Sequence, residues 1–115
     1  MHELGIVFSI IREVKKTALE HDCTKVSKVV MDIGEVSTVI PYYLEDCWKW
    51  AVAKDVEMMH GCELEVNTVS AVTLCQDCGE EYPTVTYAKV CPRCRGENTV
   101  LLRGNEVEIR QIEAE

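Results

Sequence analysis

Long apolar runs are missing from this 115-residue sequence, and none approaches the roughly 20 residues that a membrane-spanning helix needs. A positively charged start followed by an apolar stretch and a small-residue cleavage site is missing too, so we expect no secretory signal and a cytoplasmic location. No carboxylate pair or Ser/His/Asp set supports catalysis. The sequence therefore predicts neither a membrane protein nor an enzyme.

Positive charge is in short supply. The chain has 20 acidic and 12 basic side chains and a formal net charge of -8. Nucleic-acid binding normally needs a basic face that releases counterions from phosphates. Aromatic residues make up only 6% of the chain, which also weakens the case for base stacking. We therefore expect no nucleic-acid partner, and protein or metal partners fit better.

Two segments have the apolar period of amphipathic helices. The first runs from residue 4 to about residue 21, and its stripe comprises Leu4, Val7, Phe8, Ile10, Ile11, Val14 and Ala18. The second begins at Pro41, which suits a first helical turn because it has no backbone donor to leave unpaired. Its stripe comprises Tyr43, Leu44, Cys47, Trp48, Ala51 and Val52. We expect this helix to fray into Met58 and Met59, which fill irregular core space.

Three segments, near residues 25–33, 64–68 and 107–109, have the alternation of β-strands. They lie on both sides of a cysteine-rich block. The predicted fold class is therefore α+β: two helices on a three-stranded sheet with an inserted zinc-ribbon-like lobe. The expected domains are an α/β domain formed by residues 1–69 and 104–115, and a zinc-binding domain formed by residues 70–103.

Four of the seven cysteines form two Cys-x-x-Cys pairs, Cys75/Cys78 and Cys91/Cys94. Two intervening residues let a tight turn aim both sulfurs at one ion, and the glycine beyond each pair, Gly79 or Gly96, permits a reversed backbone. Four thiolates without a nearby histidine close the coordination shell, so we predict structural zinc, with rubredoxin-like iron as the chief rival. Ordinary thiols are expected at Cys23, Cys47 and Cys62.

The cysteine module alone leaves two other functions open. A zinc-ribbon module that binds proteins, or acts as a nucleic-acid adaptor, needs only the two knuckles. A thiol oxidoreductase would instead use one Cys-x-x-Cys pair as a redox dithiol. Between the knuckles, Tyr82, Pro83 and Tyr87 are expected to cover the metal lobe and not to recognise a base.

The amino terminus, Met1-His2-Glu3, directly precedes the first predicted helix. A terminal amine, deprotonated backbone amide nitrogens and the His2 imidazole can form fused chelate rings, a nitrogen-rich set that suits tetragonal Ni(II) or Cu(II). The alternative is a solvated terminal histidine followed by a glutamate that complements the helix dipole. From these residues alone both interpretations stand.

Several motifs together resemble the HypA/HybF family of hydrogenase maturation proteins, which are nickel metallochaperones. Besides both knuckles, the matching segments are Met1-His2-Glu3-Leu4, Ile33-Gly34-Glu35-Val36-Ser37, Pro41 with Leu44, and Gly61-Cys62-Glu63-Leu64. They span nearly the whole chain. Knuckles alone are common, but their combination with an initial Met-His-Glu is specific.

This resemblance implies that Met1, His2 and Glu3 bind nickel as transient cargo, with His2 essential and Glu3 offering a backbone nitrogen. It implies a separate structural zinc lobe, delivery to a hydrogenase large subunit, and a nucleotide-hydrolysing maturation partner. Some members also serve urease, and a homodimer stays open. His21 and His60 match no nickel motif of the family, and we expect both to be solvated.

Overall fold

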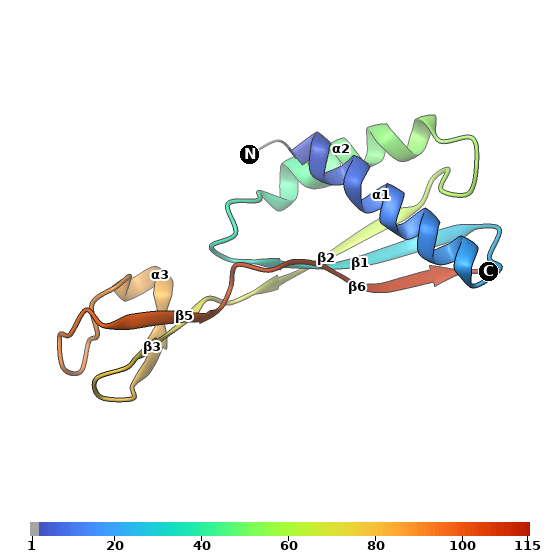
Figure 1. Ribbon diagram of the computed structural model, residues 1–115. Helices are drawn as coiled ribbons and strands as arrows, with labels where there is room; N and C mark the ends of the chain where they lie inside the picture. The colour runs from blue at the N-terminus through green and yellow to red at the C-terminus, as the bar shows by residue number, and fades with distance from the viewer. Residues whose placement is uncertain (1–2) are drawn as a thin grey trace.

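The computed structural model of the chain describes residues 3–115, in which the helices and strands form two groups (Figure 1). The larger group contains α1 (Glu3–Glu20), β1 (Val26–Gly34), α2 (Pro41–Lys54), β2 (Glu63–Val69) and β6 (Val107–Ala114). The smaller group contains β3 (Val72–Cys75), β4 (Glu81–Pro83), α3 (Thr84–Tyr87) and β5 (Thr99–Arg103). None of the described helices is long and apolar enough to cross a membrane.

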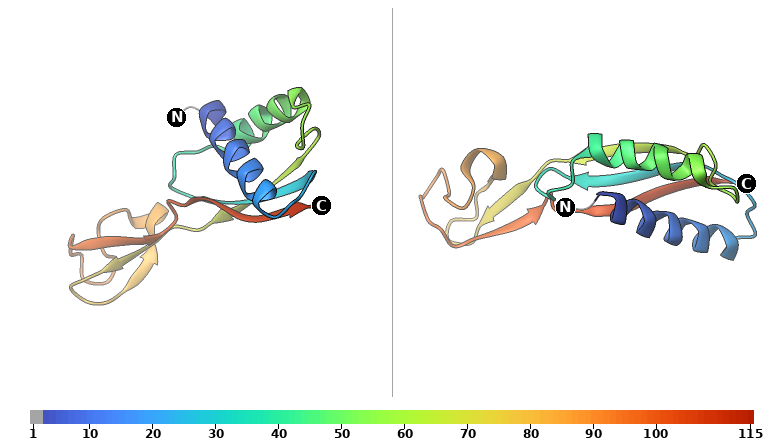
Figure 2. Two further views of the ribbon diagram at one scale, coloured as in Figure 1. Left: turned by 45° about the vertical axis from the view of Figure 1, so that its right-hand side comes forward. Right: turned by 90° about the horizontal axis from the view of Figure 1, so that it is seen from above.

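The larger sheet has the strand order β2-β1-β6, and α1 and α2 cover one of its faces (Figures 1 and 2). β1 runs parallel to β2, with Met31 opposite Val66, and antiparallel to β6, with Met31 opposite Ile109. A parallel pair needs a crossover connection, and α2 supplies it between β1 and β2. The predicted arrangement of two helices on three strands is confirmed.

The core of this domain lies between the helices and the sheet. Trp48 is its largest fully buried side chain, and its Nε1 donates a hydrogen bond to the Cys62 carbonyl at 2.8 Å. Most predicted stripe positions are buried, but Leu4, Phe8 and Tyr43 are 38%, 46% and 52% exposed. Phe8 is turned to the outer seam between the helices, where its ring meets Trp50 edge-on at 6.3 Å between centroids. The apolar stripes are therefore wider than the faces that contact the sheet.

Ion pairs connect α1 to the loop that follows α2. Lys15 Nζ lies 3.0 Å from Asp55 Oδ2 and 2.9 Å from Glu57 Oε1. Desolvation alone would lower the pKa of Lys15, but the hydrogen bonds to Glu57 and Asp55 raise it above its usual value. Desolvation likewise opposes ionisation of Asp55, but the Glu57 N–H and Lys15 outweigh it and lower the pKa of Asp55.

The second helix does not fray into Met58 and Met59, so this expectation is wrong. α2 ends at Lys54, and Asp55 has extended dihedral angles. The Asp55 carboxylate accepts the Glu57 N–H at 2.8 Å, which turns the chain away from the helix axis. The following loop nevertheless buries both methionines in the core, as their expected packing role requires.

The smaller sheet has the antiparallel order β4-β3-β5, with Leu74 opposite both Glu81 and Val100. It extends beyond one end of the larger domain, so the molecule is elongated (Figure 2). The principal extents are 55 × 26 × 17 Å and the radius of gyration is 17.7 Å.

The segments that connect the two sheets cross beside the end of β1, in a region we call the waist (residues 34–36, 69–71 and 104–106). Backbone N–H groups donate from Gly34 to Glu106 O at 2.7 Å, from Glu35 to Val69 O at 2.8 Å, and from Val36 to Gly104 O at 2.8 Å. The Glu35 carboxylate also accepts the Ala71 N–H at 2.9 Å. The loop after β1 therefore binds both connecting segments.

Two glycines allow the backbones to approach this closely at the waist. A Cβ on Gly34 would lie 2.0 Å from the Gly104 carbonyl oxygen, and a Cβ on Gly104 would lie 2.4 Å from Ala71 Cα. Gly104 also has φ +114°, which side-chain-bearing residues rarely adopt. Both positions therefore require glycine.

Candidate metal centre

The structure brings the four cysteines of the two knuckles together at the outer end of the smaller sheet. Cys75 ends β3, Cys78 lies in the turn that follows, and Cys91 and Cys94 lie in the loop after α3. Their sulfurs all lie within 4.8 Å of one another. Among residues 3–115, this is the one group of three or more His, Cys, Asp or Glu side chains placed to hold a metal ion.

The sulfur positions fit a tetrahedral zinc ion. Cys75 Sγ and Cys94 Sγ lie 3.5 Å apart, and Cys78 Sγ and Cys91 Sγ lie 3.6 Å apart. Zinc–sulfur bonds of about 2.3 Å in a tetrahedron separate the sulfurs by about 3.8 Å. These two contacts join cysteines of different knuckles, so all four sulfurs converge on one point, whereas a Cys-x-x-Cys redox dithiol needs only the two cysteines of one knuckle. The cluster therefore fits a structural zinc site, which would stabilise the lobe by crosslinking its two knuckles.

Backbone N–H groups point at the sulfurs. The Arg93 N–H donates to Cys91 Sγ and the Gly96 N–H donates to Cys94 Sγ, both at 3.4 Å. Burial opposes ionisation of Cys91, but the Cys94 and Arg93 N–H groups and the neighbouring thiols lower its pKa to about 7. The Glu80 N–H favours the Cys78 thiolate, but burial and the other three cysteines raise its pKa to about 12. A divalent cation bound by all four cysteines would resolve this competition, because it would stabilise all the thiolates together.

The two glycines beyond the knuckles have different roles. Gly79 has φ +80° and donates its N–H to the Cys75 carbonyl at 2.8 Å, as predicted. In the second knuckle Arg95 has the positive φ, at +64°, so the expectation for Gly96 is wrong. Gly96 is instead packed tightly: a Cβ there would lie 3.3 Å from Cys94 Sγ and 3.0 Å from Asp77 Oδ2.

Tyr82 covers the inner side of the cysteine cluster. It is 3% exposed, packs against Cys75 and Cys91, and donates its hydroxyl to the Ala88 carbonyl at 3.0 Å. Tyr87 meets the Tyr82 ring edge-on and is 44% exposed. Pro83 is exposed, so the expectation that it covers the lobe is wrong, because strand alternation turns it to the opposite face of the sheet from Tyr82.

The predicted nickel residues Met1 and His2 lie outside the described residues. Glu3 is the first residue of α1 and is partly exposed. This end of α1 lies toward the smaller sheet, whereas the C-terminus lies at the far end of the domain (Figures 1 and 2). His21 and His60 are exposed, as expected, and His60 Nδ1 lies 3.1 Å from the Asp55 carbonyl oxygen.

The sequence did not predict the role of the waist. Glu35 was identified only as part of a family-like motif, and Gly104 was assigned no role. The available signal was two isolated glycines, Gly34 just after the strand predicted over residues 25–33 and Gly104 shortly before the strand predicted at residues 107–109. An isolated glycine beside a strand often marks a close backbone approach.

A helix-covered sheet joined to a lobe with a four-cysteine cluster defines a small two-lobed metal-binding protein. The family described as "Hydrogenase/urease nickel incorporation, metallochaperone, hypA" matches residues 1–114. This chain belongs to that family of nickel metallochaperones, which confirms the resemblance drawn from its motifs.

Curated relatives match along the whole chain. The "Hydrogenase maturation factor HypA" of Dehalococcoides mccartyi strain 195 is 31% identical over all 115 residues and 95% of its own length. The protein of the same name from Chlorobaculum parvum is 31% identical over the full length of both chains. The "Hydrogenase maturation factor HybF" of Klebsiella pneumoniae is 27% identical over the full length of both.

The fold also matches solved structures. The solution structure of the Ni metallochaperone HypA from Helicobacter pylori superposes with a TM-score of 0.73 and 23% identity, covering 99% of this chain and 97% of the other. A second solution structure of a HypA protein has a TM-score of 0.74, 23% identity and coverage of 99% and 96%. At this identity the likeness concerns the fold, and it confirms the predicted class.

Proposed function

We propose that this chain binds Ni(II) through Met1, His2 and Glu3 and delivers it to the large subunit of a [NiFe]-hydrogenase. The observation that carries the proposal is the family match from residue 1 to residue 114, which includes the Met-His-Glu start. The relatives are named for hydrogenase maturation, whereas the family description also includes urease, so urease is the second candidate recipient.

The proposed ligands are the Met1 amine, the backbone nitrogens of His2 and Glu3, and the His2 imidazole. Backbone nitrogens bind a metal only after losing a proton, so nickel affinity rises with pH. A planar nitrogen set can be stripped one ligand at a time by an acceptor site. Transfer is then a ligand exchange and not a catalysed reaction, and the chain is not an enzyme.

The two metals have separate tasks in this proposal. Residues 1–69 and 104–115 form the nickel-binding domain, and residues 70–103 form a zinc-binding domain whose four-cysteine cluster has no open coordination position for cargo. A nucleotide-hydrolysing maturation protein is the proposed partner that drives release. The chain works in the cytoplasm.

Titration calorimetry on protein with its native amino terminus tests this proposal. His2→Ala should abolish Ni(II) binding, and so should an extension before Met1, because the amine is a ligand. Zinc content should be unchanged in both. His21→Ala is the matched control and should bind Ni(II) as the unmodified chain does. Unchanged Ni(II) affinity in His2→Ala would refute the assignment.

A further inference from the structure

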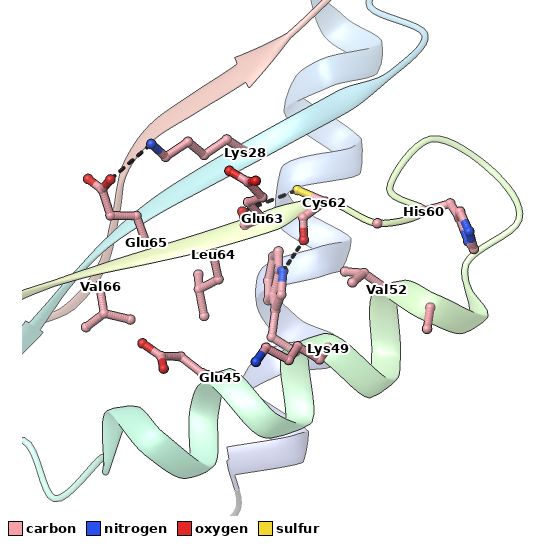
Figure 3. Close-up of a pocket in the computed structure, with 13 residues that line it drawn as sticks. Lys28, Glu45, Lys49, Val52, His60, Cys62, Glu63, Leu64, Glu65 and Val66 are labelled. Atoms are coloured by element: carbon pink, nitrogen blue, oxygen red, sulfur yellow. Dashed lines mark hydrogen bonds and ion pairs between the residues drawn. The ribbon is translucent and has the colours of Figure 1, made fainter.

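A groove of about 680 Å³ lies between α2 and β2 (Figure 3). Trp48, Val52, Leu64 and Val66 give it an apolar lining. Charged side chains surround these apolar residues, namely Lys28, Glu45, Lys49, Glu63 and Glu65. The Trp48 hydrogen bond to the Cys62 carbonyl holds α2 to the start of β2 and so fixes this end of the groove.

One side of the groove is a free strand edge. β2 is an outer strand of the larger sheet and pairs only with β1. The Val69 carbonyl accepts the Glu35 N–H, so at Val69 the backbone faces the β1 side. Because backbone direction alternates along a strand, the N–H and C=O groups of Leu64, Val66 and Thr68 point to the free edge. Within residues 3–115, no backbone hydrogen bond reaches these outward groups.

This edge lacks three of the usual protections against strand addition. Proteins commonly guard an exposed edge with a proline, a bulge or a charge that points inward. β2 contains no proline, pairs with β1 without a register shift, and turns Leu64 and Val66 toward the helix side, where both pack against the core. Its two glutamates lie on the opposite, open face of the sheet (Figure 3).

The open face beside this edge is acidic. Lys28 lies between Glu63 and Glu113 in the strand register, and its Nζ pairs with Glu65 Oε1 at 3.0 Å. Three carboxylates therefore surround one ammonium group. Opposite charges on neighbouring strands stabilise a sheet and like charges destabilise it, so this face favours a strand that brings positive charge.

We propose that the groove and the free edge of β2 bind an extended segment of a partner protein as an added fourth strand. Its apolar side chains enter the groove at alternate positions, and the Lys or Arg side chains between them lie over Glu63 and Glu65. Backbone hydrogen bonds to Leu64, Val66 and Thr68 supply affinity, and the alternating pockets and charges supply specificity.

A second copy of this chain fits the edge poorly. Antiparallel pairing of two β2 strands would place Glu63 and Glu65 of both copies on one face of the new sheet. Four carboxylates would then share that face, where only the two Lys28 side chains could compensate them. A partner of different sequence is therefore the favoured occupant.

An eight-residue peptide of alternating Val and Lys, labelled with fluorescein, is the probe. Fluorescence anisotropy measures its affinity for the zinc-loaded chain, and NMR measures amide hydrogen exchange. We expect saturable binding and slower exchange at Leu64, Val66 and Thr68. Two further peptides carry N-methyl groups, one on its Val amides and the other on its Lys amides. One of these two peptides should fail to bind, because only one set of amides faces β2.

A charge reversal tests the recognition of the open face. The double variant Glu63→Lys/Glu65→Lys should bind the Val/Lys peptide about tenfold more weakly and should prefer an alternating Val/Glu peptide. Glu81→Lys/Glu97→Lys is the matched control: it makes the same net charge change on the smaller lobe and should leave both affinities unchanged. Zinc content and helical circular dichroism verify that each variant is folded.

Three results would overturn the proposal. The first is the absence of saturable binding of the Val/Lys peptide. The second is equal affinity for the Val/Glu peptide, or equal weakening by the control variant, either of which would indicate diffuse charge attraction. The third is protection of Leu64, Val66 and Thr68 that grows with protein concentration without peptide, which would assign the edge to a second copy.

Discussion

Backbone N–H groups around the knuckle sulfurs support the cysteines as metal ligands. Arg93 and Gly96 donate N–H groups to Cys91 and Cys94, and the tight packing of Gly96 lets its N–H reach the sulfur. Such donors offset part of the negative charge of four thiolates, so the cysteines can be ionised and bind zinc at neutral pH.

Replacing one ligand should release the metal. We expect Cys94→Ser to lose most of its zinc and to unfold the smaller lobe, because a lobe this small depends on its metal crosslink. Metal analysis gives the zinc content, and NMR spectra show which residues lose dispersion. Cys23→Ser is the control and should retain zinc, because Cys23 packs at the edge of the helical core. Full zinc content in Cys94→Ser would contradict the assignment of this ligand.

The waist offers a prediction on stability. Gly104→Ala should lower the free energy of unfolding by about 3 kcal/mol, because it combines a strained φ with a collision against Ala71. Gly61→Ala is the matched control, since Gly61 also has positive φ, at +70°, but its added Cβ meets nothing within 4 Å. It should cost only about 1 kcal/mol. Urea denaturation gives both values, and equal costs would show that the close approach contributes nothing.

At the residue scale, the spacing of the cysteines predicted more of the metal site than the composition of the chain did. Two knuckles of fixed spacing were enough to predict that four sulfurs converge. The exchange of roles between Gly96 and Arg95 could not be predicted, because either residue completes the turn locally and only the contact with Asp77 and Cys94 decides between them. The exposure of Phe8 likewise depends on Trp50 of the neighbouring helix.

At the level of elements, the ion pair between α1 and the loop after α2 makes stability depend on pH. The pKa of Asp55 is lowered in the folded chain, so its contribution is complete above the unfolded value of about 3.9 and is lost as pH falls through the folded value. The pKa of Lys15 is raised, so its contribution is complete below about 10.4 and is lost as pH rises through the folded value.

Asp55→Asn should therefore make the free energy of unfolding depend less on pH in the acid range. At pH 7 we expect the variant to be less stable by on the order of 1 kcal/mol, since solvent screens part of the pair, and the difference should shrink below about pH 4. Urea denaturation followed by tryptophan fluorescence reports on this region, because both tryptophans lie in α2. A difference that stays constant between pH 3 and pH 7 would mean that Asp55 acts through packing and not through charge.

The long elements were predictable and the short ones were not. Both major helices and the strands of the larger sheet have apolar periods that their burial enforces, so the sequence alone indicates them. β4 and α3 contain three and four residues, too few for any period to show. Their positions follow from the convergence of the sulfurs and from the Tyr82 contact with Cys75 and Cys91.

At the scale of the whole molecule, the waist fixes how the two lobes are held. Two chain segments alone would make a hinge, but the loop after β1 is hydrogen-bonded to both of them. This placement could not be predicted from the sequence, because it depends on backbone contacts among residues far apart along the chain. Nothing in a local apolar pattern indicates such contacts.

Glu35→Ala should loosen the waist without affecting the zinc site. The variant loses the hydrogen bond from the Ala71 N–H, so we expect the two lobes to show different rotational correlation times and alignment tensors by NMR. Zinc content should remain that of the unmodified chain. Glu97→Ala, an exposed position on the smaller lobe, is the control and should leave the alignment unchanged. Lobes that still tumble as one body in Glu35→Ala would show that the backbone bonds suffice.

The elongated form has a consequence for measuring mass in solution. A compact chain of this length has a radius of gyration of about 13 Å, whereas this one has 17.7 Å and is more than three times as long as it is thin, at 55 Å against 17 Å. Friction with the solvent rises with such asymmetry, so a single copy should leave a gel-filtration column early, near the position of a heavier globular standard. Light scattering or sedimentation equilibrium, which report mass independently of shape, will separate an extended monomer from a true dimer.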